Sequence, residues 1–371
     1  MKPSNWIPNR IRLVLTFLFL LSIAGCNLPA SSPTPDLFAT LQAATPLGVT
    51  PVAPATLVST PPFQESTNPA APTLNTVLQT PLMNGEIPAP SSADGLTGHI
   101  VFTCQVYKTQ FADQICIMNA DGSGYRQITD KSDVRNFYPS LSPDGKYVVY
   151  SRFRQENIIE IREQYLADGS EKRLTDKLGI ATAPEISPDG NSIVFMLWTA
   201  ATDQNQIWVM DRDGSDPHRI RKILGWDPTW APSGNQILFA ATDPNDGTNQ
   251  LFVMDANGAN RSRISDLPSI RGRSDWSGGG QYIVTYSGEP WHRNVFIMNS
   301  DGSDSHRLTP DGGNSQGPSF SPDGKWVVFT AYYDKYGDDH GCELYIIRTD
   351  GTDLRRLTNN DYCDYQPRWG P

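Results

Sequence analysis

The chain has 371 residues, and its 30 Lys and Arg against 40 Asp and Glu give a formal net charge of -10. Binding to nucleic acid or to an anionic lipid surface needs clustered Lys and Arg, so this composition disfavours both as partners. Length alone does not set the number of domains, because propellers and barrels use more than about 250 residues as one folding unit. The domain organisation therefore has to come from internal repeats.

Residues 1–25 have the three parts of a secretory signal. A positive stretch with Lys2, Arg10 and Arg12 precedes an apolar run over 13–21, which is too short to span a bilayer. The signal ends in Ser-Ile-Ala-Gly-Cys at 22–26, which resembles the lipobox of bacterial lipoproteins. The resemblance implies that Cys26 is acylated and anchors the protein on the extracytoplasmic side of a bacterial membrane, at the cell surface or in the periplasm. The alternative is an ordinary export signal followed by a chance thiol.

Residues 26–96 are rich in Pro, Thr, Ser and Ala and have little apolar periodicity from which to build a core. We therefore expect a disordered tether. In an extended polyproline form, at ~3.1 Å per residue, it would reach up to about 200 Å from the bilayer.

From residue 97 to 371 the chain repeats itself. A short strand and a turn at 139–145, Pro-Ser-Leu-Ser-Pro-Asp-Gly, return at 184–190, 228–234, 274–280 and 318–324, and a shortened copy ends the chain at 367–371. The five turn glycines are 45, 44, 46 and 44 residues apart, a period typical of propeller blades.

Each repeat predicts four strands. The first turn leads into a buried strand such as 147–150, a third strand such as 206–210 ends in an Asp-Gly or Asn-Gly hairpin turn, and a fourth strand ends near Arg-Leu-Thr. The first repeat lacks its first strand, which the last residues of the chain supply. The sequence thus predicts an all-β fold, a six-bladed propeller of four-stranded antiparallel blades whose ring is closed by the C-terminal strand.

The element Pro-x-aromatic-Ser-Pro-Asp-Gly-Lys, followed by Asp-Gly-Ser and Arg-Leu-Thr, resembles the repeat of the TolB-like β-propeller family over residues 97–371. Propellers of prolyl oligopeptidase-type proteins share it. The resemblance implies a periplasmic or surface protein that engages protein partners. TolB itself has a small α/β domain where this chain has its tether, which argues against the same role in an envelope complex.

No motif predicts a catalytic or metal site. Gly313 to Gly317 match the nucleophile-elbow pattern, but they lie in a loop between blades and no hydrolase domain accompanies them. The five histidines lack the close spacing of a metal pair. We expect no cofactor, although the acidic segments 334–343 and 361–364 leave open a calcium ion on the loop face or in the channel.

Strand direction alternates within a blade, so the connections lie on two faces. The Ser-Pro-Asp-Gly and Asp-Gly turns share one face, the turn face, and are expected to be too short to build a pocket. The longer connections form the opposite face, the loop face, where binding residues are usually found. Aromatic, Arg and acidic side chains there are candidates for a recognition surface. The candidates are Tyr138, Trp226, Asp227, Arg271, Arg273, Trp291, His292, Tyr332, Tyr333, Tyr336 and Tyr365.

Four further cysteines are an even number in an exported chain, in which disulfides persist. Cys104 and Cys116 fall on neighbouring strands of the shared blade, and Cys342 and Cys363 fall in two connections on one face. We therefore predict the pairs Cys104–Cys116 and Cys342–Cys363.

These features predict a monomeric, membrane-anchored propeller that binds an envelope protein or a glycan. The enzyme alternative is a polysaccharide lyase or hydrolase at the channel mouth. It would need two acids and a His or Tyr to converge from different blades.

Overall fold

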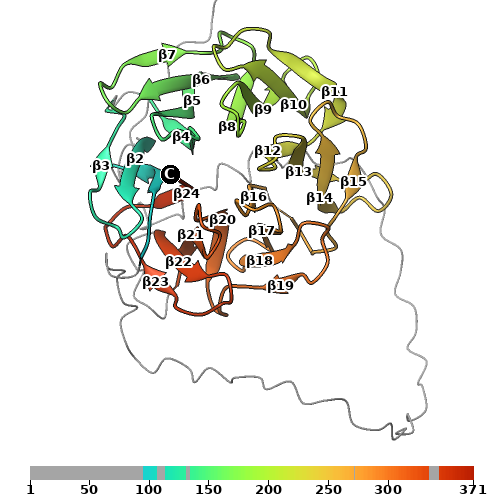
Figure 1. Ribbon diagram of the computed structural model, residues 1–371. Helices are drawn as coiled ribbons and strands as arrows, with labels where there is room; N and C mark the ends of the chain where they lie inside the picture. Colours follow the sequence, from blue (N-terminus) through green and yellow to red (C-terminus); the bar gives the residue numbers. More distant parts are fainter. Residues whose placement is uncertain (1–94, 107–112, 131–133, 271, 334–341) are drawn as a thin grey trace, which may run out of the picture. The chain divides into compact units, whose positions relative to one another are not determined.

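The computed structural model describes residues 95–106, 113–130, 134–270, 272–333 and 342–371. The described part of the chain contains twenty-four strands arranged as a ring of six antiparallel blades (Figure 1). Blade 1 consists of β24 and β1 to β3, and the following sets of four strands form blades 2 to 6 in chain order. The predicted six-bladed propeller is therefore confirmed. The predicted signal peptide, Cys26 and nearly all of the predicted tether lie outside the described residues.

The strand bounds follow the repeat. They are β1 His99–Gln105, β2 Asp113–Asn119, β3 Arg126–Gln127, β4 Asn136–Leu141, β5 Tyr147–Gln155, β6 Ile158–Tyr165, β7 Glu171–Arg173, β8 Ile180–Ile186, β9 Ser192–Thr199, β10 Gln204–Asp211, β11 His218–Leu224, β12 Trp226–Trp230, β13 Gln236–Thr242, β14 Asn249–Asp255, β15 Ser262–Arg263, β16 Asp275–Trp276, β17 Tyr282–Ser287, β18 Asn294–Asn299, β19 His306–Arg307, β20 Asn314–Phe320, β21 Trp326–Tyr332, β22 Glu343–Arg348, β23 Arg355–Arg356 and β24 Asp364–Gly370. The first strand of each blade lies nearest the centre of the ring, and the fourth lies outermost (Figure 1).

The Ser-Pro-Asp-Gly turn shows why this sequence recurs. In blade 2 the Ser142 hydroxyl donates to Asp144 Oδ1 (2.7 Å) and accepts hydrogen bonds from the amides of Lys146 (3.0 Å) and Tyr147 (3.1 Å). Gly145 has a φ of 68°, a conformation that glycine adopts without steric cost. The turn therefore satisfies its own polar groups while it reverses the chain between the first and second strands.

The C-terminal strand closes the ring as predicted. β24 pairs with β1 in antiparallel register, with Trp369 opposite Ile100 and Arg368 opposite Val101. The Trp369 indole also donates to the Thr97 carbonyl (2.9 Å). Because both ends of the described chain are held in one blade, the propeller has no open seam.

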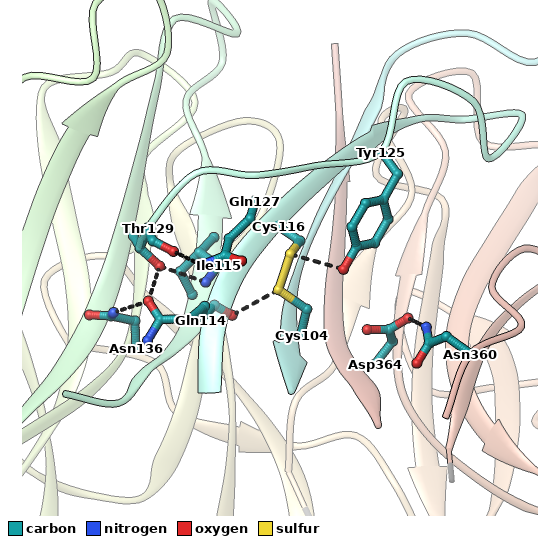
Figure 2. The surroundings of a disulfide bond; sticks show 10 residues. All are labelled: Cys104, Gln114, Ile115, Cys116, Tyr125, Gln127, Thr129, Asn136, Asn360 and Asp364. Carbon is teal, nitrogen blue, oxygen red and sulfur yellow. Dashed lines mark hydrogen bonds between the residues drawn. A yellow bond between two sulfur atoms is a disulfide. The ribbon is translucent and has the colours of Figure 1, made fainter. Parts of the chain in front are cut away.

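Both predicted disulfides are present. Cys104 and Cys116 join β1 to β2 with a Cα–Cα distance of 5.8 Å, and Cys342 and Cys363 are joined with a Cα–Cα distance of 4.5 Å. Figure 2 shows the first bond inside blade 1, with the Tyr125 hydroxyl 3.2 Å from Cys116 Sγ. Beside it, Asn136 of blade 2 donates to Gln114 Oε1 (2.9 Å) and ties the two blades together (Figure 2).

Apolar side chains fill the spaces between neighbouring blades. Phe239 of blade 4, for example, packs with Val194 and Ile207 of blade 3 in one buried cluster. Among the described residues there is no helix long and apolar enough to cross a membrane.

Candidate functional site

Equivalent positions of the six innermost strands place one ring of residues around the axis near the loop face. Each lies immediately before the proline, or its counterpart Ser274, that opens the repeat. We call this set the loop-side ring: Tyr138, Ala183, Asp227, Arg273, Gly317 and Gln366. The backbone has positive φ at five of these six positions, and in the Arg273 blade at the preceding Gly272. A bulge in the inner-strand pairing accompanies this conformation in blades 1, 2, 3, 4 and 6.

Arg273 connects this ring across the axis. Its guanidinium donates to the carbonyl of Gln366 in blade 1 (3.1 Å) and to the carbonyl of Pro139 in blade 2 (2.5 Å). Its Cζ lies 5.4 Å from the centre of the Tyr138 ring, and its amide donates to Asp227 Oδ2 (3.1 Å). The structure therefore brings together three of the predicted binding residues, but as a buried polar cluster and not as an exposed surface.

A second ring lies two residues further along each strand, closer to the turn face. We call it the turn-side ring: Ser140, Glu185, Thr229, Asp275, Ser319 and Arg368. Arg368 forms an ion pair with Glu185 (2.9 Å) and lies 3.8 Å from Asp275. Glu185 also accepts hydrogen bonds from the Thr229 hydroxyl and the Trp230 amide. The charged members of this ring therefore come from blades 1, 3 and 5, and one arginine lies between two carboxyl groups at the axis.

Burial shifts the protonation equilibria of both rings. It raises the pKa of Asp227 to about 6, although the Arg273 guanidinium and amide oppose the shift. Burial also raises the pKa of Glu185, with Arg368 opposing. For Arg273 burial acts in the other direction and lowers the pKa, and the neighbouring Arg368 adds to this effect. Because an arginine stays protonated in proteins, the carboxyl groups are the members of the rings that can take up a proton.

The space left on the axis is small. A cavity of about 120 Å³ is bounded by the charged members of the turn-side ring, Glu185, Asp275 and Arg368, with Trp369 beside them. Sites for small molecules usually span about 300–1,000 Å³. The cavity at the turn-side ring is therefore smaller than a typical small-molecule site.

The other predicted binding residues lie in different surroundings. Trp291, in the connection between β17 and β18, is 64% exposed, and His292 beside it is also exposed. Trp226 and Tyr332 are half-buried at the edge of their blades. Arg271 and Tyr336 lie outside the described residues.

Two of the predicted binding residues, Tyr333 and Tyr365, make contacts within the propeller. Tyr333 is fully buried, packs edge-on against Tyr345 (5.2 Å between ring centres) and shares a hydrogen bond with Ser315 (3.0 Å), so the prediction that it lies on a surface is wrong. Tyr333 follows the last residue of β21, Tyr332, and its ring joins the buried cluster between blades 5 and 6. The Tyr365 side chain hydrogen-bonds with Asp113 and Arg135, so it joins blades 1 and 2.

Sequence reasoning missed the turn-side ring. Glu185, Asp275 and Arg368 occupy the variable position of the Pro-x-aromatic element, which is Ser or Thr in the other three blades. Aligning the six copies by this position would have shown three charges converging on one axis. The expectation that the turn face holds no pocket is also wrong, since a cavity of about 500 Å³ opens there between blades 2 and 3.

Within the described ranges, no group of three or more His, Cys, Asp or Glu side chains is arranged to hold a metal ion. The four described histidines lie on exposed segments, and a ring nitrogen of each approaches a nearby carbonyl. His340 lies outside the described residues.

Residues 95–371 match the TolB beta propeller domain family. Among curated proteins, the Tol-Pal system protein TolB of Francisella tularensis subsp. tularensis (strain WY96-3418) is 31% identical over 98 residues. The match covers 26% of this chain and 22% of that protein, so the chain spans about a fifth of the curated relatives that it matches.

Among solved structures, TolB from Acinetobacter baumannii superposes with a TM-score of 0.64 at 24% identity, over 74% of this chain and 67% of that one. The putative TolB from Agrobacterium tumefaciens gives a TM-score of 0.55 at 20% identity, over 74% and 98%. At these identities the likeness establishes the fold.

Proposed function

Because the chain belongs to the TolB beta propeller domain family, whose fold is a protein-binding scaffold, we propose that it is a scaffold on the extracytoplasmic side of a membrane. In this proposal lipid on Cys26 anchors the chain, and the loop face of the propeller binds a protein or a glycan of the cell envelope. The two disulfides support an oxidising compartment.

The observation that carries the proposal is the way in which Trp291 is held. It is 64% exposed and has a φ of 68°, a conformation that costs free energy for a large side chain. Two hydrogen bonds to Glu289 hold the connection in place. The His292 amide donates to the Glu289 carbonyl (2.9 Å), and the Ser269 hydroxyl donates to the Glu289 carboxylate (2.7 Å). A braced, exposed tryptophan is typical of a binding hot spot.

The charges on the axis favour a scaffold over the lyase or hydrolase. Asp227 and Tyr138 do converge near the loop face, but both are buried and Arg273 bridges them to neighbouring blades. The cavity of about 120 Å³ at the turn-side ring is also smaller than a typical small-molecule site.

The topology also suits this arrangement. β1 starts and β24 ends at the turn face, where His99 Nδ1 lies 3.0 Å from the Pro371 carbonyl oxygen. His99 and Pro371 therefore lie at the face opposite Trp291.

The test is site-specific photo-crosslinking in cells that produce the full chain. A photoreactive amino acid replaces Trp291 in one strain and Tyr282 in another. Tyr282 is the matched control, because it is 45% exposed and begins β17, whereas Trp291 lies in the connection after the other end of that strand. We expect a discrete adduct from position 291 and none from position 282. Equal adducts at both positions, or none at 291, would contradict the proposal.

A further inference from the structure

The cavity of about 500 Å³ lies on the turn face, between blades 2 and 3. Blade 2 contributes the end of β6 and the start of β7, and blade 3 contributes the turn after β10. The side chains that matter for the argument are Glu163, Tyr165, Glu171, Asp211, Arg212 and Asp213.

The six repeats provide an internal comparison for Glu163. In the pairing of the second and third strands, Glu163 lies opposite Val149. The residues at the same position of the other five blades are all β-branched and aliphatic: Ile117, Val209, Val253, Ile297 and Ile346. Blade 2 alone among these places a carboxyl group where the other blades bury an aliphatic side chain.

Arg212 is the corresponding exception in blade 3. The same position, directly after the third strand, holds Ala120, Leu166, Ala256, Ser300 and Thr349 in the other blades. Arg212 lies 3.1 Å from Glu163 and 3.8 Å above the Tyr147 ring, and it donates to the Tyr165 hydroxyl (3.2 Å). Between blades 2 and 3 an ion pair thus replaces aliphatic packing, and the cavity opens beside it.

Stability does not account for this exchange. Replacing a buried ion pair by well-packed apolar residues is often neutral or stabilising. The Glu163 side chain is 5% exposed, and its Oε2 forms an ion pair with Arg212 (3.1 Å). This departure from the repeat coincides with the cavity, and an exchange that stability does not explain points to a ligand.

The charge of the cavity indicates which ligand would fit. Four carboxyl groups line it: Glu163 pairs with Arg212, Glu171 pairs with Arg152 and Arg162, and Asp211 and Asp213 are the two for which the described residues provide no arginine partner. At its rim, Asp213 accepts hydrogen bonds from Ser215 that lower its pKa, so this carboxylate is ionised at neutral pH. Tyr165, 39% exposed, adds an aromatic ring, and carboxylates together with an aromatic face attract organic cations.

We propose that this cavity is a binding site for an organic cation of side-chain size, a guanidinium or primary ammonium group on a short aliphatic stem. The cation would contact Asp211 and Asp213 and lie against Tyr165. The site is on the face opposite Trp291, so it goes beyond the scaffold function proposed above and can fail without affecting it.

Three probes test the site by NMR titration of the purified propeller in the presence of EDTA. N-acetyl-arginine methylamide represents a side chain within a polypeptide, agmatine represents a free amine, and N-acetyl-citrulline methylamide is the neutral counterpart of the first. We expect binding of the capped arginine at least tenfold tighter than that of the capped citrulline. Binding of agmatine alone would identify a free amine as the ligand. If neither cation bound more tightly than citrulline, the proposal would be overturned.

Two sets of variants locate the binding and separate it from folding. Asp211→Asn should weaken binding of the cation by roughly tenfold, equivalent to ~1.4 kcal/mol. Its matched control, Asp255→Asn, changes the same position of blade 4 and should leave binding unchanged. Equal effects of the two variants would contradict the assignment.

The double variant Glu163→Val with Arg212→Ala installs the residues that face each other between blades 3 and 4, Val209 and Ala256. We expect it to melt at or above the temperature of the wild type, because apolar packing replaces the ion pair. A large loss of stability would show that the ion pair is structural, and the argument that the exchange serves a ligand would be wrong.

Discussion

Replacing Arg368 by alanine should destabilise the propeller strongly. The side chain is 7% exposed, and its removal leaves Glu185 (2.9 Å) and Asp275 (3.8 Å), which are 15% and 18% exposed, without their nearest cation. It also removes hydrogen bonds to the carbonyls of Ser274 (3.1 Å) and Pro318 (3.5 Å). Breaking a buried ion pair by removing one partner costs about 3–5 kcal/mol. For a domain of this size that corresponds to a fall in Tm of roughly 6–20 °C.

The loss should depend on pH. The pKa of Glu185 is raised in the folded wild type, and without Arg368 it should rise further above its value in the unfolded chain. A folded state that binds a proton more tightly than the unfolded state gains stability as the pH falls. The deficit of Arg368→Ala should therefore be smaller at pH 5 than at pH 8.

Calorimetric melting at both pH values measures the effect. Arg368→Lys keeps a positive charge and should lie between the wild type and the alanine variant. Arg307→Ala, which removes an arginine with a 41% exposed side chain paired with Asp311, should change stability by less than about 0.5 kcal/mol. The reasoning would be refuted if Arg368→Ala melted within about 2 °C of the wild type at pH 8, or if its deficit were equal at both pH values.

Three further outcomes are expected. Cys26→Ala should move the protein from the membrane to the soluble fraction, and persistent membrane association would exclude the lipid anchor. Replacing Cys342 and Cys363 by serine should cost ~3 kcal/mol in urea unfolding, because a loop of 21 residues is no longer closed; mass mapping that finds four free thiols in the wild-type propeller would contradict both disulfides. Burial raises the pKa of Asp364 to about 7 in the folded state, so the wild type should lose stability as the pH rises from about 4 to about 7, and Asp364→Asn should flatten that slope. An unchanged slope in urea titrations would refute this assignment.

The repeat was sufficient to predict the fold. The spacing of the turn glycines predicted six blades, and the two incomplete copies predicted that β24 would pair with β1. The disulfide pairs followed from which strands and faces the cysteines occupy. These predictions succeed because each blade uses the same local turn chemistry, which the sequence states directly.

The site was less predictable, because it depends on side-chain direction and on contacts between blades. Asp227 and Arg273 were expected on a surface, yet they are buried, where the backbone takes positive φ at Asp227 and at Gly272. The pairing of Arg368 with Glu185 spans 183 residues of sequence, and no local pattern indicates it. Glu163 differs from the aliphatic residues at the same position of the other blades, and this difference is found only when the third strands are aligned by their pairing register.

The central claim is that the loop face binds an envelope partner through Trp291. The most direct test is the affinity of the purified propeller for the partner captured at that position, measured for the wild type, Trp291→Ala and Tyr282→Ala. A hot-spot tryptophan predicts binding weaker by roughly 30-fold or more for Trp291→Ala, equivalent to ~2 kcal/mol, and unchanged binding for Tyr282→Ala. Equal affinities of the wild type and Trp291→Ala would contradict the account.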